Sequence, residues 1–157
     1  MNYLQQILPK TVSNKYSGPL IPLYVFYLIT SISIARSLIH IFSQDGGAGS
    51  IATIPINDYV NGGKEAVVFM FAMWGLGQLL MGIFYAIVSI KYKSLLPLMY
   101  IFIFLEYFGG FLIGQYKGLA TEGTPPGAIG AQILMPLSIM MLIWILNGSH
   151  ESRRIRN

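Results

Sequence analysis

The chain has 157 residues, of which 54% are hydrophobic and only 10% are charged, and its formal net charge is +4. A soluble domain carries about 25% charged residues, so this composition excludes a water-soluble globular protein. The basic residues flank apolar runs and form no stripe with exposed aromatics, so no nucleic-acid partner is expected. Cysteine is absent, which excludes disulfide relays, thiolate catalysis and cysteine-ligated metals.

Apolar segments along the chain predict transmembrane helices. A helix of roughly 20 residues, rising about 1.5 Å per residue, crosses a hydrocarbon core about 30 Å thick. Four segments are long enough, at residues 19–43, 65–90, 95–116 and 128–147. The first is longer than the apolar part of a signal peptide and is expected to be a retained span. We therefore predict an all-α integral membrane bundle of four transmembrane helices, formed by residues 1–157 as a single membrane domain.

The positions of lysine and arginine predict the orientation, because short cytoplasmic flanks are enriched in positive residues. One side receives Lys10 and Lys15 before the first span, Lys91 and Lys93 between spans two and three, and Arg153, Arg154 and Arg156 after the fourth. The other side has only Lys64 and Lys117. Both termini are expected in the cytoplasm, with the chain in the cell (inner) membrane as a multi-pass protein.

The first outer loop, residues 44–64, is unusually long. Connections above about 12–15 residues are usually functional or disordered. Its middle, SIATIPI at 50–56, is apolar and β-branched, and is expected to pack on the mouth of the bundle. The sequence Asp45-Gly46-Gly47 predicts a helix end, since glycine readily adopts the left-handed conformation that terminates helices.

Polar residues recur along the first span at steps of three and four, which places them on one helix face: Thr30, Ser33, Arg36, Ser37, His40 and Ser43. A charged group at membrane depth costs several kcal/mol unless it is paired, solvated or able to reach the interface. This face is therefore expected to point into the bundle or into a wet cavity.

The third span contains a natural partner for this face. Glu106, Gly110 and Gly114 are four residues apart on one side of the helix, and small-xxx-small spacing favours close packing of two helices. Counted from the outer ends of their spans, Arg36 lies roughly 10 Å deep and Glu106 roughly 15 Å deep. We predict an interaction between Arg36 and Glu106, direct or through water.

Further polar residues are expected near the mouth of the same region. Glu65, at the outer start of span two, is placed to face His40 or Arg36.

The polar cluster has three interpretations. In one interpretation, Arg36 and Glu106 form a buried pair that sets helix register. In a second, an outward-opening polar pocket lets Arg36 hold an anionic or carbonyl group while His40 or Glu65 exchanges protons, a role that suits a histidine. In a third, Arg36 extends to lipid headgroups.

Other motifs favour structural roles. Asp45, Asp58 and Glu65 do not match the spacing of a calcium loop, so no metal site is expected. His40 is expected to be a hydrogen-bonded structural histidine rather than a ligand. The glycines of WGLGQ and Gly82 in span two predict close helix packing, and no cofactor is expected.

The layout resembles the DoxX-like group of small bacterial four-helix membrane proteins. The resemblance rests on WGLGQLLMG after Lys64-Glu65, on EYFGGFLIG in span three and on PPG at the start of span four, over residues 64–147. It implies four spans and a poorly defined role, and it transfers no catalytic residue. The first outer loop is longer than in that group.

The functional prediction is a binding or accessory component with an outward-facing polar site between spans one, two and three. Its predicted residues are Ser33, Arg36, His40, Glu65 and Glu106. Assembly with itself or with other subunits of a larger membrane complex fits this interpretation, and the lipid bilayer is its expected surrounding. One alternative is an oligomeric proton-coupled transporter of small solutes, with Glu106 as the titrating group. A membrane enzyme acting on a lipid or quinone ranks third, because no complete catalytic constellation is visible.

Overall fold

The structure is a computed structural model that describes residues 3–60 and 62–154, excluding the side chains of 149–154. Every regular element in these residues is helical. The elements are α1 (Tyr3–Ile7), α2 (Leu20–Phe42), η1 (Ile56–Asp58), α3 (Gly63–Lys91), η2 (Lys93–Leu95), α4 (Leu96–Tyr116) and α5 (Pro126–Arg154). Within the described residues, four helices are long and apolar enough to cross a membrane. The predicted all-α membrane bundle is confirmed, with α2, α3, α4 and α5 at the four predicted spans.

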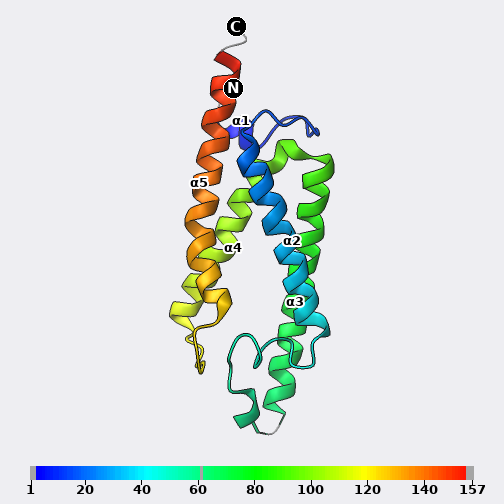
Figure 1. Cartoon of the computed structure of the whole chain (residues 1–157), viewed down its shortest axis with the longest axis vertical. Helices are drawn as coiled ribbons and strands as arrows, with labels where there is room; N and C mark the ends of the chain where they lie inside the picture. Colours follow the sequence, from blue (N-terminus) through cyan, green and yellow to red (C-terminus); the bar gives the residue numbers. More distant parts are fainter. Residues whose placement is uncertain (1–2, 61, 155–157) are drawn as a thin grey trace.

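The four long helices form two hairpins. Helix α2 packs against α3 and helix α4 packs against α5, and the two pairs meet at the end where α1 and the last turns of α5 lie (Figure 1). We call this the terminal end. At the opposite end, the loop end, are the connections 43–62 and 117–125. The hairpins diverge toward the loop end in the same view.

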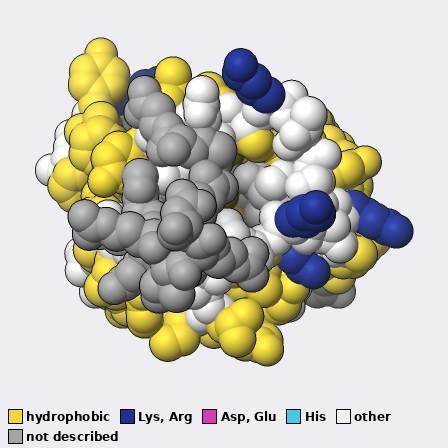
Figure 2. All heavy atoms as spheres, turned by 90° about the horizontal axis from the view of Figure 1, so that it is seen from above, with side chains coloured by type: hydrophobic (Ala, Val, Ile, Leu, Met, Phe, Trp, Pro, Cys, Tyr) yellow, Lys and Arg dark blue, Asp and Glu magenta, His cyan; other side chains and the backbone are white. Residues whose placement is uncertain are grey.

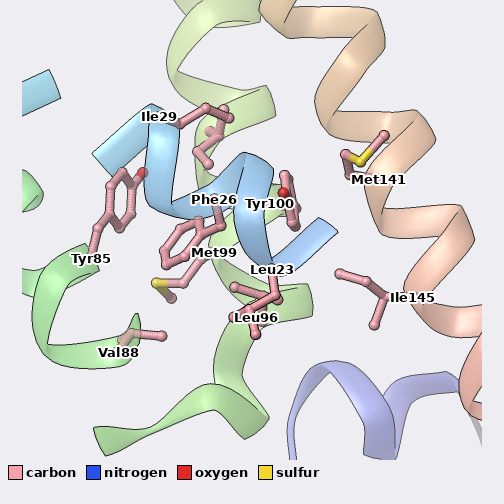
Figure 3. Packing of buried hydrophobic residues seen from close by; sticks show 11 residues of the cluster. Leu23, Phe26, Ile29, Tyr85, Val88, Leu96, Met99, Tyr100, Met141 and Ile145 are labelled. Carbon is pink, nitrogen blue, oxygen red and sulfur yellow. The ribbon is translucent and has the colours of Figure 1, made fainter. Parts of the chain in front are cut away.

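The main hydrophobic core lies near the terminal end, where residues of all four long helices meet. Phe26 of α2 is fully buried, and its ring lies 5.4 Å from that of Tyr85 and 6.0 Å from that of Tyr100 (Figure 3). The hydroxyl of Tyr100 donates a hydrogen bond of 2.6 Å to the carbonyl of Pro22. This bond satisfies a buried polar group and ties α4 to the first turn of α2.

Two glycines let α2 and α3 approach closely. A Cβ atom at Gly75 would lie 2.6 Å from Cβ of His40, and one at Gly82 would lie 2.9 Å from Cγ1 of Ile34. A Cβ at Gly77 would meet nothing within 4 Å. The predicted close packing of span two is therefore confirmed for Gly75 and Gly82, and it is wrong for Gly77.

The glycines of α4 do not have the predicted packing partner. A Cβ atom at Gly110 or Gly114 would meet nothing within 4 Å, and both residues are exposed. The prediction that they lie in a packed interhelical surface is wrong. Small residues permit a close approach but do not select the partner, and in this chain α2 makes its close approach to α3 instead.

The connection from α2 to α3 begins with a tightly hydrogen-bonded turn. Gly46 and Gly47 have φ angles of 61° and 76°, in the left-handed region. However, α2 already ends at Phe42 and its C-cap Ser43 is extended, so the prediction that these glycines end the helix is wrong, and they form the turn after it. The carboxylate of Asp45 accepts backbone hydrogen bonds of 2.8 Å from Gly47 and 2.6 Å from Ser50. Burial alone raises the pKa of Asp45, but these bonds outweigh it and lower the pKa to about 2.

The rest of this loop packs on α3 and reaches the second hairpin. Ala48, Ile54 and Ile56 form a small buried cluster against the first turns of α3. Thr53 accepts a backbone hydrogen bond of 2.8 Å from Glu122, and its hydroxyl lies 3.1 Å from the carbonyl of Gly123. Its φ angle of 54° is strained for a β-branched residue. These contacts join the two hairpins at the loop end.

Basic side chains gather at the terminal end. Figure 2 looks onto this end and shows several side chains in the colour shared by Lys and Arg, and none in the colour of Asp and Glu among the described residues in view. The backbone of Ser94, between α3 and α4, donates 3.1 Å to Ser13, which brings the segments carrying Lys10, Lys15, Lys91 and Lys93 together. Three arginines were also predicted to lie on this side. The side chains of Arg153 and Arg154 lie outside the described part, and Arg156 lies outside it entirely.

Candidate functional site: a polar cleft between the two hairpins

Arg36 is held on the surface of α3 by two contacts. Its Nε donates a hydrogen bond of 3.3 Å to Oε1 of Gln78. Its guanidinium carbon lies 5.8 Å from the centre of the Trp74 ring, within the range of a cation–π contact. Nε is one of several guanidinium donors, and the guanidinium also interacts with the hydroxyl of Tyr107 on α4.

A small open cleft lies beside this guanidinium. It is shallow: its enclosed volume is about 10 Å³, which is room for about one water-sized group. Helices α2, α3 and α4 all contribute to its wall, which consists of Ser33, Arg36, Gln78, Met81, Gly82, Tyr85 and Glu106. Ser33, Arg36 and Glu106 were predicted from the sequence, and they lie together here. Glu106 alone comes from the second hairpin.

Two buried polar groups in this wall have no hydrogen-bond partner among the described residues. They are Nε2 of Gln78 and the hydroxyl of Tyr85, on side chains that are only 7% and 2% exposed. A buried polar group without a partner costs about 1–3 kcal/mol. Both residues line the cleft, and a polar atom that reaches these two closed-off groups would recover that cost.

The predicted interaction between Arg36 and Glu106 takes a looser form than a salt bridge. The described residues contain no ion pair within 4.0 Å between these side chains, although they are close enough to interact electrostatically. The guanidinium contacts Gln78 and Trp74 instead. The carboxylate and the guanidinium therefore stand on separate parts of the cleft wall.

His40 has a structural position beside the cleft. It is buried, and its Nδ1 lies 2.7 Å from the carbonyl of Gly46, so Nδ1 carries the proton and donates. Its ring stacks on Trp74 at 5.0 Å and meets Phe71 edge-on at 5.6 Å. Trp74 thus lies between His40 and Arg36. His40 does not line the cleft, and its Nε2 has no partner among the described residues.

Glu65 lies away from both residues that it was predicted to face. It is exposed in the first turn of α3, whereas His40 lies level with Gly75, ten residues farther along that helix. Ten helical residues span about 15 Å. The structure does not bring Glu65 to the cleft, because α3 extends past the end of α2 toward the loop end.

The rest of the polar face of α2 points inward, as the helical spacing predicted. Thr30 and Ser37 are buried and donate hydrogen bonds of 2.8 Å and 2.6 Å to the carbonyls of Phe26 and Ser33. These hydroxyls are satisfied within their own helix. They provide packing surface, and Arg36 is the charged group of this face that lines the cleft.

Sequence reasoning missed Gln78 and Tyr85 as cleft residues. Gln78 was assigned to helix packing with its glycine neighbours, and Tyr85 was one of many aromatics. The available signal was an amide side chain inside an apolar span, since such groups need a partner in the membrane. In the described part of the chain, no group of three or more His, Asp or Glu side chains is arranged to hold a metal ion.

Searches of protein-family models, of curated proteins and of solved structures find no match to this chain. The resemblance to the DoxX-like group accordingly stays a prediction from the sequence.

Proposed function

We propose that this protein is a small binding component of the cell (inner) membrane, and that it holds the polar group of an amphiphilic molecule in the cleft between its hairpins. The observation that carries the proposal is the pair of buried polar groups without partners, Nε2 of Gln78 and the hydroxyl of Tyr85. Both line a cleft that also presents Arg36 and Glu106. Such an array suits a ligand that supplies hydrogen-bonding atoms at membrane depth.

The surroundings of the cleft favour a ligand that arrives from the bilayer. The half of α4 beyond Glu106 is apolar and largely exposed, including Phe108, Phe111 and Leu112. An amphiphile can therefore keep its apolar part in contact with lipid-facing surface while its polar group enters the cleft. The lysines at the terminal end favour a cytoplasmic terminal end and an outward-facing loop end.

Native mass spectrometry of the purified protein, after incubation with a total lipid extract, tests this proposal. We expect a bound amphiphile on the wild type and its loss in Gln78→Leu, which removes the amide donor while keeping a similar side-chain volume. Gln132→Leu is the matched control, because Gln132 is exposed on α5 and lies outside the cleft. Equal lipid adducts on wild type and on Gln78→Leu would contradict the proposal.

A second candidate function is an oligomeric proton-coupled transporter of small solutes. One observation favours it: the Glu106 carboxylate reaches the cleft from the second hairpin and is exposed there. Uptake into liposomes under a pH gradient tests it. A transporter predicts solute uptake that Glu106→Gln abolishes and that Glu65→Gln, a matched substitution far from the cleft, leaves intact. Absence of gradient-driven uptake in the wild type would eliminate this candidate.

A further inference from the structure

The walls of the cleft differ in hydrogen-bonding character. On the side of the first hairpin, the guanidinium of Arg36 and Nε2 of Gln78 can only donate hydrogen bonds. On the side of α4, the carboxyl group of Glu106 can only accept them in its ionised form. The hydroxyl of Tyr85 can do either. A molecule that fills the cleft therefore needs an acceptor on one side and a donor on the other.

The charges of the cleft favour an uncharged ligand. With Glu106 ionised, Arg36 and Glu106 contribute one positive and one negative charge, and they are not joined in an ion pair within 4.0 Å. An anion would bring a like charge to Glu106, and a cation would bring one to Arg36. At membrane depth, an extra charge without full pairing is costly. A neutral group that bridges the two side chains meets neither penalty.

Open surface continues from the cleft along α4 toward the loop end. Gly110 and Gly114 follow Glu106 at steps of four, so the three residues lie on one face of the helix. A Cβ atom at either glycine would meet nothing within 4 Å. This face offers room for an extended hydrocarbon chain next to the helix backbone, beginning at the carboxylate.

We propose that the cleft binds a neutral lipid whose head group carries a hydroxyl beside an ester or amide carbonyl. The carbonyl oxygen accepts hydrogen bonds from Gln78 and Arg36, the hydroxyl donates to Glu106, and the acyl chain lies along Gly110 and Gly114. This inference rests on the proposed binding function and names the class of its ligand.

Three probes with the same oleoyl chain test the ligand class by native mass spectrometry titration. Monooleoylglycerol has both the carbonyl and a hydroxyl, methyl oleate has only the carbonyl, and oleate is an anion. We expect monooleoylglycerol to bind the wild type about tenfold more tightly than methyl oleate, the factor expected for one hydrogen bond to a charged group. Equal binding of these two probes would overturn the role of the hydroxyl.

The variant Glu106→Gln separates a neutral ligand from an anion by the sign of its effect. It removes the negative charge and keeps the side-chain shape. We expect it to weaken monooleoylglycerol binding, whereas a site for anions would bind oleate more tightly after the same substitution. Glu65→Gln should change neither affinity, because Glu65 lies outside the cleft.

The outcomes distinguish failure of this inference from failure of the proposed function. If oleate binds best and Glu106→Gln strengthens its binding, the neutral-lipid class is overturned while the cleft remains a binding site. The proposed function predicts that at least one probe binds the wild type, that Gln78→Leu weakens this binding and that Gln132→Leu leaves it unchanged. If no probe shows this pattern, the proposed function itself is contradicted.

Discussion

The contact between α2 and α3 at Gly75 makes a quantitative prediction. In Gly75→Ala the added Cβ would lie 2.6 Å from Cβ of His40 and 3.1 Å from the carbonyl oxygen of Ser37. Both atoms belong to or directly adjoin the backbone of α2, so no side-chain rotation relieves the overlap. The helices must move apart, and the cost is about 1–3 kcal/mol for overpacking of this kind.

A matched substitution on the same helix isolates this steric term. In Gly77→Ala the added Cβ would meet nothing within 4 Å. Alanine is favoured over glycine in a helix by up to about 1 kcal/mol, and this gain applies to both variants. We therefore expect Gly75→Ala to be destabilised by about 0–3 kcal/mol after this gain, and Gly77→Ala to be neutral or stabilised by up to about 1 kcal/mol.

Thermal unfolding in detergent, followed by tryptophan fluorescence, measures the difference, since Trp74 lies at this contact. Gly75→Ala should unfold at a clearly lower temperature than Gly77→Ala. Gly82→Ala should fall between them, because its added Cβ would approach Cγ1 of Ile34 at 2.9 Å, and part of that side chain can rotate. Equal unfolding temperatures for Gly75→Ala and Gly77→Ala would refute the close approach of the two helices.

Three further predictions concern the loop end and the acyl-chain surface. A Cβ at Gly123 would lie 4.0 Å from Cβ of Thr53, within the Cβ–Cβ range of a disulfide, about 3.5–4.5 Å. The double variant Thr53→Cys/Gly123→Cys should therefore form a disulfide in this cysteine-free chain. The disulfide would appear as a reducible shift in gel mobility that neither single variant shows. Asp45 has a pKa of about 2 instead of its ordinary 3.8, so its stabilising effect is complete above pH 3.8 and is lost as the pH falls through about 2. The unfolding temperature of the wild type should therefore decrease in acid, and that of Asp45→Asn should lack this decrease. Parallel curves of unfolding temperature against pH for the two proteins would contradict this role of Asp45. Gly110→Leu should weaken monooleoylglycerol binding, whereas Gly77→Leu, at an equally open position on α3, should not; equal affinities would argue against the acyl-chain position.

The helices follow from the sequence because long apolar runs in a membrane have few alternatives to helices. The depth of each residue along its span also predicted that Arg36 and Glu106 lie in the same region, and both line the cleft. The rise per residue is fixed by helix geometry, so residues on adjacent spans can be compared by depth before any packing is known.

The remaining details depend on which helix faces which, and single-sequence patterns do not encode that choice. Gly75 and Gly110 have the same small-residue character, yet only Gly75 contacts another helix. Glu65 was misplaced because α3 extends beyond α2, and that offset depends on the packing register. The role of Gln78 emerges only when its Nε2 is found buried without a partner.

Protection of the cleft by its ligand shows directly where the ligand binds. Ser33 lines the cleft, so Ser33→Cys introduces a single thiol there, and Thr124→Cys introduces one in the exposed second outer loop as a control. Monooleoylglycerol at saturating concentration should slow the reaction of N-ethylmaleimide with Ser33→Cys and leave the rate for Thr124→Cys unchanged. An unchanged labelling rate for Ser33→Cys, at a concentration that saturates binding, would contradict the placement of the ligand in this cleft.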